Sequence, residues 1–176
     1  MTRRREDIAV WRRNRRGIAA VEFGIFAPLL LFLAVVMVDF GFAFNNKLRI
    51  VSATSTAAQY AFANGQSLNA STLSTFRTNV TTVAQTTANM TSAPTVTVLF
   101  NNAADSSTLA NFYCASGFAP VTWTSTGTSS VSCGGSVMSG KFVTITVMST
   151  ANSLFKSDSI LGRVITTTDT AIVRVQ

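Results

Sequence analysis

An uncharged apolar run, Phe23–Val38, constrains this chain more than any other feature. It comprises 16 residues (FGIFAPLLLFLAVVMV), slightly fewer than the roughly 20 of a standard transmembrane helix. Apolar residues continue on both sides of the run, so we expect Ile18–Phe44 to form one long membrane-spanning helix. Pro28 lies inside it and lacks a backbone donor, which favours a kink or a locally unwound turn.

Two acidic residues flank the run. Glu22 and Asp39 lie 17 positions apart, which corresponds to about 25 Å along a helix. The hydrocarbon core of a bilayer is about 30 Å thick, so Glu22 is expected near the inner interface and Asp39 near the outer one. Asp39 either bonds a partner helix or only marks the interface. Gly41 either permits close helix packing or is only a weak point in the helix.

The basic residues concentrate before the membrane segment. Residues 1–17 hold seven Arg and two acids, and thus five of the seven net positive charges. Such a flank typically keeps its end of the chain in the cytoplasm. Binding to nucleic acid is disfavoured, because the sequence shows neither a second basic patch nor a stacking platform.

Three processing routes are compatible with this N-terminus. A secretory signal peptide would be cleaved near Gly41-Phe42-Ala43, although Asp39 and the apolar residues up to Phe44 weaken that site. A second route leaves the helix as an uncleaved anchor. The third is cleavage after Gly17, on the cytoplasmic side of the helix, between Gly17 and Ile18.

The spacing of several short segments resembles a known family. Gly17 is followed by IAAVEF, which places Glu22 fifth after the glycine, as in the processing site of type IV pilin-like proteins. The chain from about residue 15 to 65 is similar to the TadE/TadF-like pseudopilins of the tight-adherence (Flp pilus) machinery. The segments that carry this similarity are Gly17–Phe23, Pro28–Leu31, Val38–Gly41 and Ala57–Ala61.

This resemblance implies a minor pilin-like subunit whose leader a prepilin peptidase removes after Gly17. Glu22 would then pair with the new α-amine of Ile18 and assist subunit assembly. The expected partners are the inner membrane, the peptidase, other pilins or pseudopilins and the assembly platform. The N-terminus would be cytoplasmic and the C-terminal part periplasmic. Neither a nucleic acid nor a small-molecule substrate is expected.

The region after the membrane changes its periodicity. The first helix is expected to end near Asn64-Gly65, and a second helical period covers Leu68–Met90. Alternation by two residues then predicts strands. The predicted fold is α+β: a leader (1–17), a transmembrane helix (18–44), an extracytoplasmic helical region (45–92) and a small antiparallel sheet (93–176). The strands are expected at Thr95–Phe100, Phe142–Met148 and Thr170–Val175, less clearly at Val121–Thr124 and Ser129–Cys133, with turns at Gly134-Gly135 and Ser139-Gly140.

The helix beyond the membrane carries a mild stripe of apolar or small residues. Its members are Leu48, Val51, Ser52, Ser55, Ala58 and Phe62.

The two cysteines, Cys114 and Cys133, predict a structural disulfide, because the domain is expected outside the cytoplasm and a CxxC redox motif is absent. The sequence contains no His, which excludes a His-based catalytic triad or His-ligated metal site within this chain. No catalytic residue, metal site or cofactor is predicted, and the chain is not expected to be an enzyme. The rival hypotheses are an uncleaved membrane-anchored periplasmic binding or adhesion module and, with little support, a tethered enzyme.

Overall fold

Helix α1 (Arg3–Asn64) is the longest element of the chain. In the computed structural model, residues 3–117, 120–151 and 165–176 are described, with only the backbone described for residues 3–16, Ile18, Ala151 and Ile165. The chain divides into two units, Met1–Phe42 and Ala43–Gln176, which are described separately below. The helix ends beside Gly65, as predicted. It starts before Gly17 rather than after it, because the preceding basic segment is itself helical.

In the second unit, helix α2 (Leu73–Ala88) follows the end of α1. It starts five residues later than the periodicity predicts. Asn69 takes the chain into a turn instead, since its Oδ1 accepts hydrogen bonds from the N–H groups of Ser71 and Thr72, both at 3.0 Å. The helix stops at Asn89, which adopts the left-handed conformation with φ 45°.

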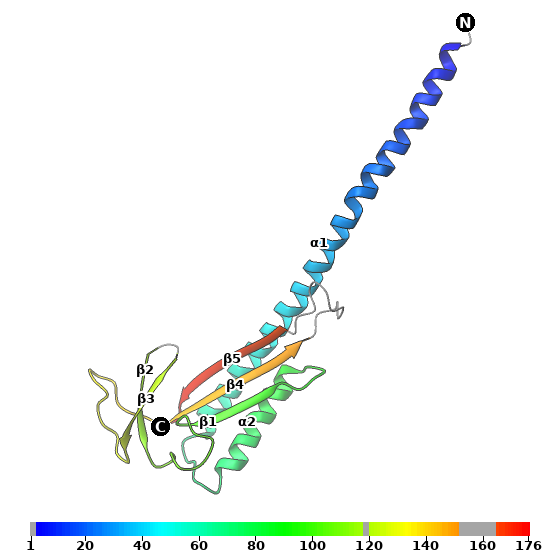
Figure 1. The fold of residues 1–176 in the computed structure, drawn as a ribbon. Helices are drawn as coiled ribbons and strands as arrows, with labels where there is room; N and C mark the ends of the chain where they lie inside the picture. Colours follow the sequence, from blue (N-terminus) through cyan, green and yellow to red (C-terminus); the bar gives the residue numbers. More distant parts are fainter. Residues whose placement is uncertain (1–2, 118–119, 152–164) are drawn as a thin grey trace. The chain divides into compact units, whose positions relative to one another are not determined.

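Strands β1 (Thr95–Phe100), β4 (Phe142–Ala151) and β5 (Ile165–Arg174) form an antiparallel sheet in the order β1-β4-β5 (Figure 1). These three strands were predicted, and the last two are longer than predicted. The weaker candidate Val121–Thr124 also coincides with a strand, from Thr122 onwards. Val143, Ile145 and Val147 alternate along β4 and are completely buried. The central strand thus turns one face towards the core.

The core of this unit lies between that sheet and the two helices. α1 contributes small side chains, Ala57 and Ala61 together with Ile50, and α2 contributes Phe76 and Val80. Small side chains allow the helix backbone to come close to the sheet. The stripe seen in the sequence does not mark the buried face of α1: Leu48, Val51 and Phe62 are 52%, 40% and 58% exposed, whereas the buried residues are Ala53, Thr54, Ala57 and Ala61.

A second sheet pairs β2 (Phe112–Ser116) with β3 (Thr122–Gly127), also antiparallel. The α+β class is confirmed, but the single predicted sheet is in fact two. The Ser129–Cys133 strand is wrong, because that segment forms only an isolated bridge, Ser132 to Met138. The predicted Ser139-Gly140 turn is also wrong, since Gly140 pairs with Tyr113 and so connects the second sheet to the segment that enters β4.

Candidate functional site

The predicted processing segment lies entirely within α1. Gly17 is exposed, and no heavy atom lies within 4 Å of a Cβ built there. Glu22 is also exposed. Glu22 lies five positions after Gly17 and four positions after Ile18. The backbones of these residues are helical, so Ile18 and Glu22 lie one helical turn apart on the same face.

The membrane segment is apolar around its whole circumference. The exposed large apolar residues from Val21 to Val38 have exposed fractions between 37% and 69%. A helix that is apolar on all sides without protein covering it is suited to lipid. In the described part of the chain, one helix is long and apolar enough to cross a membrane, within Ala19–Asn64. It fits a single-pass anchor.

The residues expected to act in helix packing lie in the same helix. The helical conformation continues without a break through Pro28, so the locally unwound turn is not observed. Gly41 is exposed, and a Cβ built there meets no heavy atom within 4 Å. Asp39 is partly buried. Because the helix is continuous from Glu22 to Asp39, the spacing of about 25 Å between the two carboxylate positions holds.

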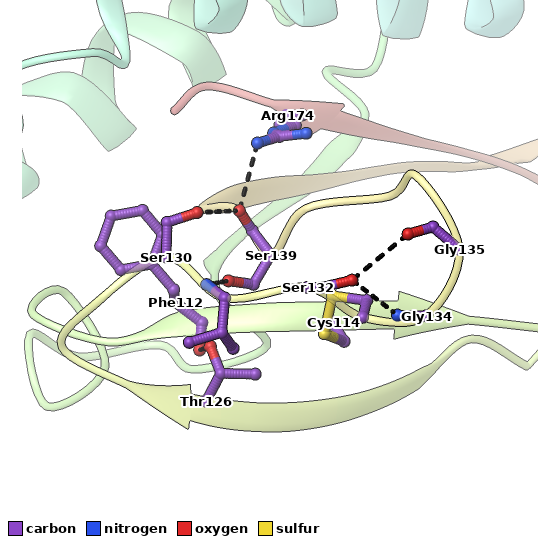
Figure 2. Close-up of a disulfide and its surroundings, with 11 residues drawn as sticks. Phe112, Cys114, Thr126, Ser130, Ser132, Gly134, Gly135, Ser139 and Arg174 are labelled. Atoms are coloured by element: carbon purple, nitrogen blue, oxygen red, sulfur yellow. Dashed lines mark hydrogen bonds between the residues drawn. A yellow bond between two sulfur atoms is a disulfide. The ribbon is translucent and has the colours of Figure 1, made fainter.

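The predicted disulfide joins Cys114 to Cys133, whose Cα atoms are 5.6 Å apart, a usual separation for such a bridge. Cys114 lies on β2 (Figure 2). Cys133 lies in the segment that follows the end of β3 at Gly127. Beside Cys133, Gly134 and Gly135 have φ values of 111° and 62°. Those values favour glycine, as the predicted turn requires. The bridge fixes this turn to the second sheet.

Ser139 organises the other end of the same segment (Figure 2). It is completely buried. Its Oγ accepts a hydrogen bond from the N–H of Val131 at 2.9 Å, and its carbonyl oxygen accepts one from Arg174 Nη2 at 3.1 Å. The buried hydrogen bonding of Ser139 was not predicted from the sequence, because Ser-Gly is a common turn signal. The pairing partner, Arg174, lies 35 residues away.

A groove in this unit was also not predicted from the sequence. α2 and β1 border a groove with a volume of about 460 Å³, and Arg77 is the charged residue in its lining. Sequence periodicity cannot indicate this groove, because it depends on which strand lies at the sheet edge. Within the described ranges, no group of three or more Cys, Asp or Glu side chains is placed to hold a metal ion.

Comparison with known proteins agrees with the resemblance carried by the N-terminal motifs. A family model described as TadE-like protein matches residues 17–59. The match begins at Gly17 and extends through the membrane segment into the part of α1 that packs in the core. No curated protein and no solved structure matches the chain. Over residues 17–59, the chain is therefore similar to the TadE-like family.

Proposed function

We propose that the chain is a minor pilin-like subunit, a pseudopilin, which initiates or supports the assembly of tight-adherence (Flp) pili. The observation that carries this proposal is the TadE-like match, whose first residue is Gly17. An exposed helical segment with the uncharged apolar run Phe23–Val38 follows it. The protein would be anchored in the bacterial inner membrane, with its basic end in the cytoplasm and residues after the helix in the periplasm.

Maturation would occur at the Gly17–Ile18 peptide bond. A prepilin peptidase would hydrolyse it, leaving a carboxylate on Gly17 and a free α-amine on Ile18. The chain is thus a substrate of the peptidase and not itself an enzyme. Most of the net positive charge leaves with the leader, because residues 1–17 account for five of the seven net positive charges.

Glu22 would give the new amine a partner. The helical backbone places Ile18 four residues before Glu22, a spacing at which side chains and termini on one helix face meet. The same carboxylate can reach the amine of a neighbouring subunit. In lipid, screening by water and salt is weak, so such a pair is stronger than on a soluble surface. The pair would help to position each subunit among other pilins at the assembly platform.

The N-terminal residue of the protein from its native host tests the maturation step. We expect the mature chain to begin at Ile18, and Gly17→Val to prevent cleavage. Gly24→Val is the matched control, because Gly24 is an exposed glycine of the same helix with no heavy atom near its Cβ position. An intact Met1 in cells with an active prepilin peptidase would overturn the proposal in favour of an uncleaved anchor. A start at Phe44 would indicate a secreted protein.

Piliation tests the role of Glu22. Glu22→Ala is expected to insert into the membrane normally but to reduce the number of pili. Glu6→Ala is the control, because Glu6 lies in the leader and would be discarded before assembly. Normal piliation by Glu22→Ala would refute the assembly role of this carboxylate, whichever N-terminus the protein has.

A further inference from the structure

The groove between α2 and β1 has walls of two kinds. Along one wall, α2 presents polar side chains one helical turn apart, and along the other β1 presents two valines. Its volume of about 460 Å³ falls in the range of ligand-binding clefts. It is lined by Ser74, Arg77, Thr78, Thr81, Thr82, Gln85, Val96 and Val98.

The strand that borders this groove is an edge strand, because the sheet order is β1-β4-β5. In an antiparallel pair, successive residues direct their N–H and C=O groups alternately towards the partner strand and away from it. The N–H of Asn101 bonds the carbonyl of Phe142 at 2.8 Å, whereas Phe100 exchanges bonds with Ala103, on the side away from β4. By the same alternation, Val96 and Val98 direct their backbone groups outwards.

The two outward-facing positions differ from Phe100 in one respect. Ala103 satisfies the N–H and C=O of Phe100, at 2.9 and 3.0 Å. Across residues 3–117, 120–151 and 165–176, no hydrogen bond is found that satisfies the outward groups of Val96 and Val98. An open strand edge of this kind is a template for pairing with another chain.

One hydrogen bond lies near each end of the groove. Gln85 Nε2 donates to the carbonyl of Pro94 at 3.2 Å, just before β1. At the opposite end, Arg77 Nη1 donates to the carbonyl of Ala104. A guanidinium has five N–H donors, so Arg77 retains donors for a further acceptor. Among the described residues that line the groove, none is acidic, so none neutralises Arg77.

We propose that this groove binds an extended peptide segment of a partner protein, which adds as a strand to the outer edge of β1 and places an Asp or Glu side chain against Arg77. Main-chain pairing with Val96 and Val98 would supply affinity, as in other cases of strand addition. The carboxylate would supply specificity through a charge-assisted hydrogen bond. The row of hydroxyl groups on α2 would contact the polar side chains of the peptide.

A second copy of this chain is a less suitable occupant. Its sheet has two edge strands, β1 and β5. β1 (TVTVLF) carries no Asp or Glu that could meet Arg77 of the first copy. Lys47 Nζ already donates to the carbonyl of Thr168 on β5, at 2.8 Å, and forms an ion pair with Asp169. α1 therefore already covers part of that edge. A flexible extended segment meets no such obstacle.

The proposal can be tested with the full chain in lipid nanodiscs and synthetic seven-residue peptides of alternating Val and Thr. Two probes carry one Asp, at the first or the last position, so that either strand direction can bring it to Arg77. Titration of the ¹⁵N-valine-labelled protein should shift the amide signals of Val96 and Val98 saturably. Peptides with Asn in place of Asp, or with alternate amides N-methylated, should bind at least tenfold more weakly.

Two variants locate the site on the protein. Val96→Pro removes one outward N–H but no ladder bond to β4, so the strand should persist and peptide affinity should fall at least tenfold. Arg77→Gln should abolish the preference for Asp over Asn. Arg49→Gln is its matched control, because Arg49 likewise donates to a backbone carbonyl, that of Asn89 at 2.6 Å, but does not line the groove. It should bind the peptides as the wild type does.

Several results would overturn the proposal. One is that neither Asp peptide binds. Another is that the N-methylated peptides bind as tightly as the Asp peptides, or that Val96→Pro binds the Asp peptides as tightly as the wild type does. Self-association of the protein that Val96→Pro abolishes, without any peptide binding, would identify a second copy as the occupant. None of these outcomes depends on whether the leader is cleaved or pili are assembled.

Discussion

Lys47 Nζ lies 3.2 Å from Asp169 Oδ1, and this ion pair joins α1 to β5 across 122 positions of sequence. The same ammonium group donates to the neighbouring carbonyl of Thr168. Lys47 lies only three residues before Ile50, the first fully buried side chain of α1. The pair therefore stands at the edge of the core, where α1 first meets the sheet.

This ion pair should contribute little to stability. The side chains of Lys47 and Asp169 are 42% and 28% exposed, and exposed pairs are typically worth less than about 1 kcal/mol. Lys47→Met retains the apolar stem and should lower the free energy of unfolding by no more than that, with a smaller effect in high salt. Urea unfolding in detergent micelles at low and high salt measures the loss in free energy of unfolding and its salt dependence. A salt-independent loss of several kcal/mol would contradict this interpretation.

The buried face of α1 can be tested by adding bulk. Ala57 is completely buried, so Ala57→Leu should overpack the core and cost about 1–3 kcal/mol. Ser55→Leu is the matched control, because Ser55 is exposed on the same helix and its substitution should change stability by less than about 0.5 kcal/mol. Thermal unfolding of both variants gives the comparison. Similar losses would mean that another face of α1 contacts the sheet.

The disulfide should stabilise the second sheet. Cys114 and Cys133 are 19 positions apart, for which loop closure predicts about 3 kcal/mol. The double variant Cys114→Ser/Cys133→Ser should therefore unfold at lower urea concentration than the oxidised protein. Reduced wild-type protein is the control and should behave like the variant. Two reactive thiols in the unreduced protein after periplasmic export would refute the bridge itself.

Asp105 makes a pH-dependent contribution to the stability of the folded state. Hydrogen bonds from the hydroxyl and the N–H of Ser107 hold the pKa of its carboxyl below the ordinary value of 3.8. Because the pKa is lower in the folded state, this contribution is fully present above about pH 3.8 and is lost as the pH falls through the lowered pKa. Ser107→Ala should raise that pKa, as ¹³C-carboxyl NMR titration can measure. Ser106→Ala should leave it unchanged.

Strands with regular alternation were predictable from the sequence. Val143, Ile145 and Val147 recur at every second position and are all buried in β4. Strand β2 was missed because its burial does not alternate: Phe112, Tyr113 and Cys114 are all partly buried. Pairing with β3 and the bridge to Gly140 hold it in place instead. Such long-range pairing leaves no local periodicity.

The buried face of α1 could not be read from the sequence, for a different reason. Hydrophobicity alone favours Leu48, Val51 and Phe62 as core residues, whereas the core uses Ala57 and Ala61. Close packing against a sheet selects for small volume as much as for apolar character. In a segment rich in Ala, Ser and Thr, both faces of the helix carry small side chains, so the sequence does not indicate which face is buried. The groove beside Arg77 was equally hidden, because it exists only through the order of the strands.

The Cys114–Cys133 bridge also determines how far the chain can be stretched. A fully extended chain spans about 3.3–3.6 Å per residue. The bridge joins residues 19 positions apart, so roughly 65 Å of chain cannot extend when the two ends of the chain are pulled apart. β3 lies inside this ring. A pulling force transmitted along the backbone would thus pass from β2 directly to the segment before β4, and β3 would bear none of it until the disulfide is reduced.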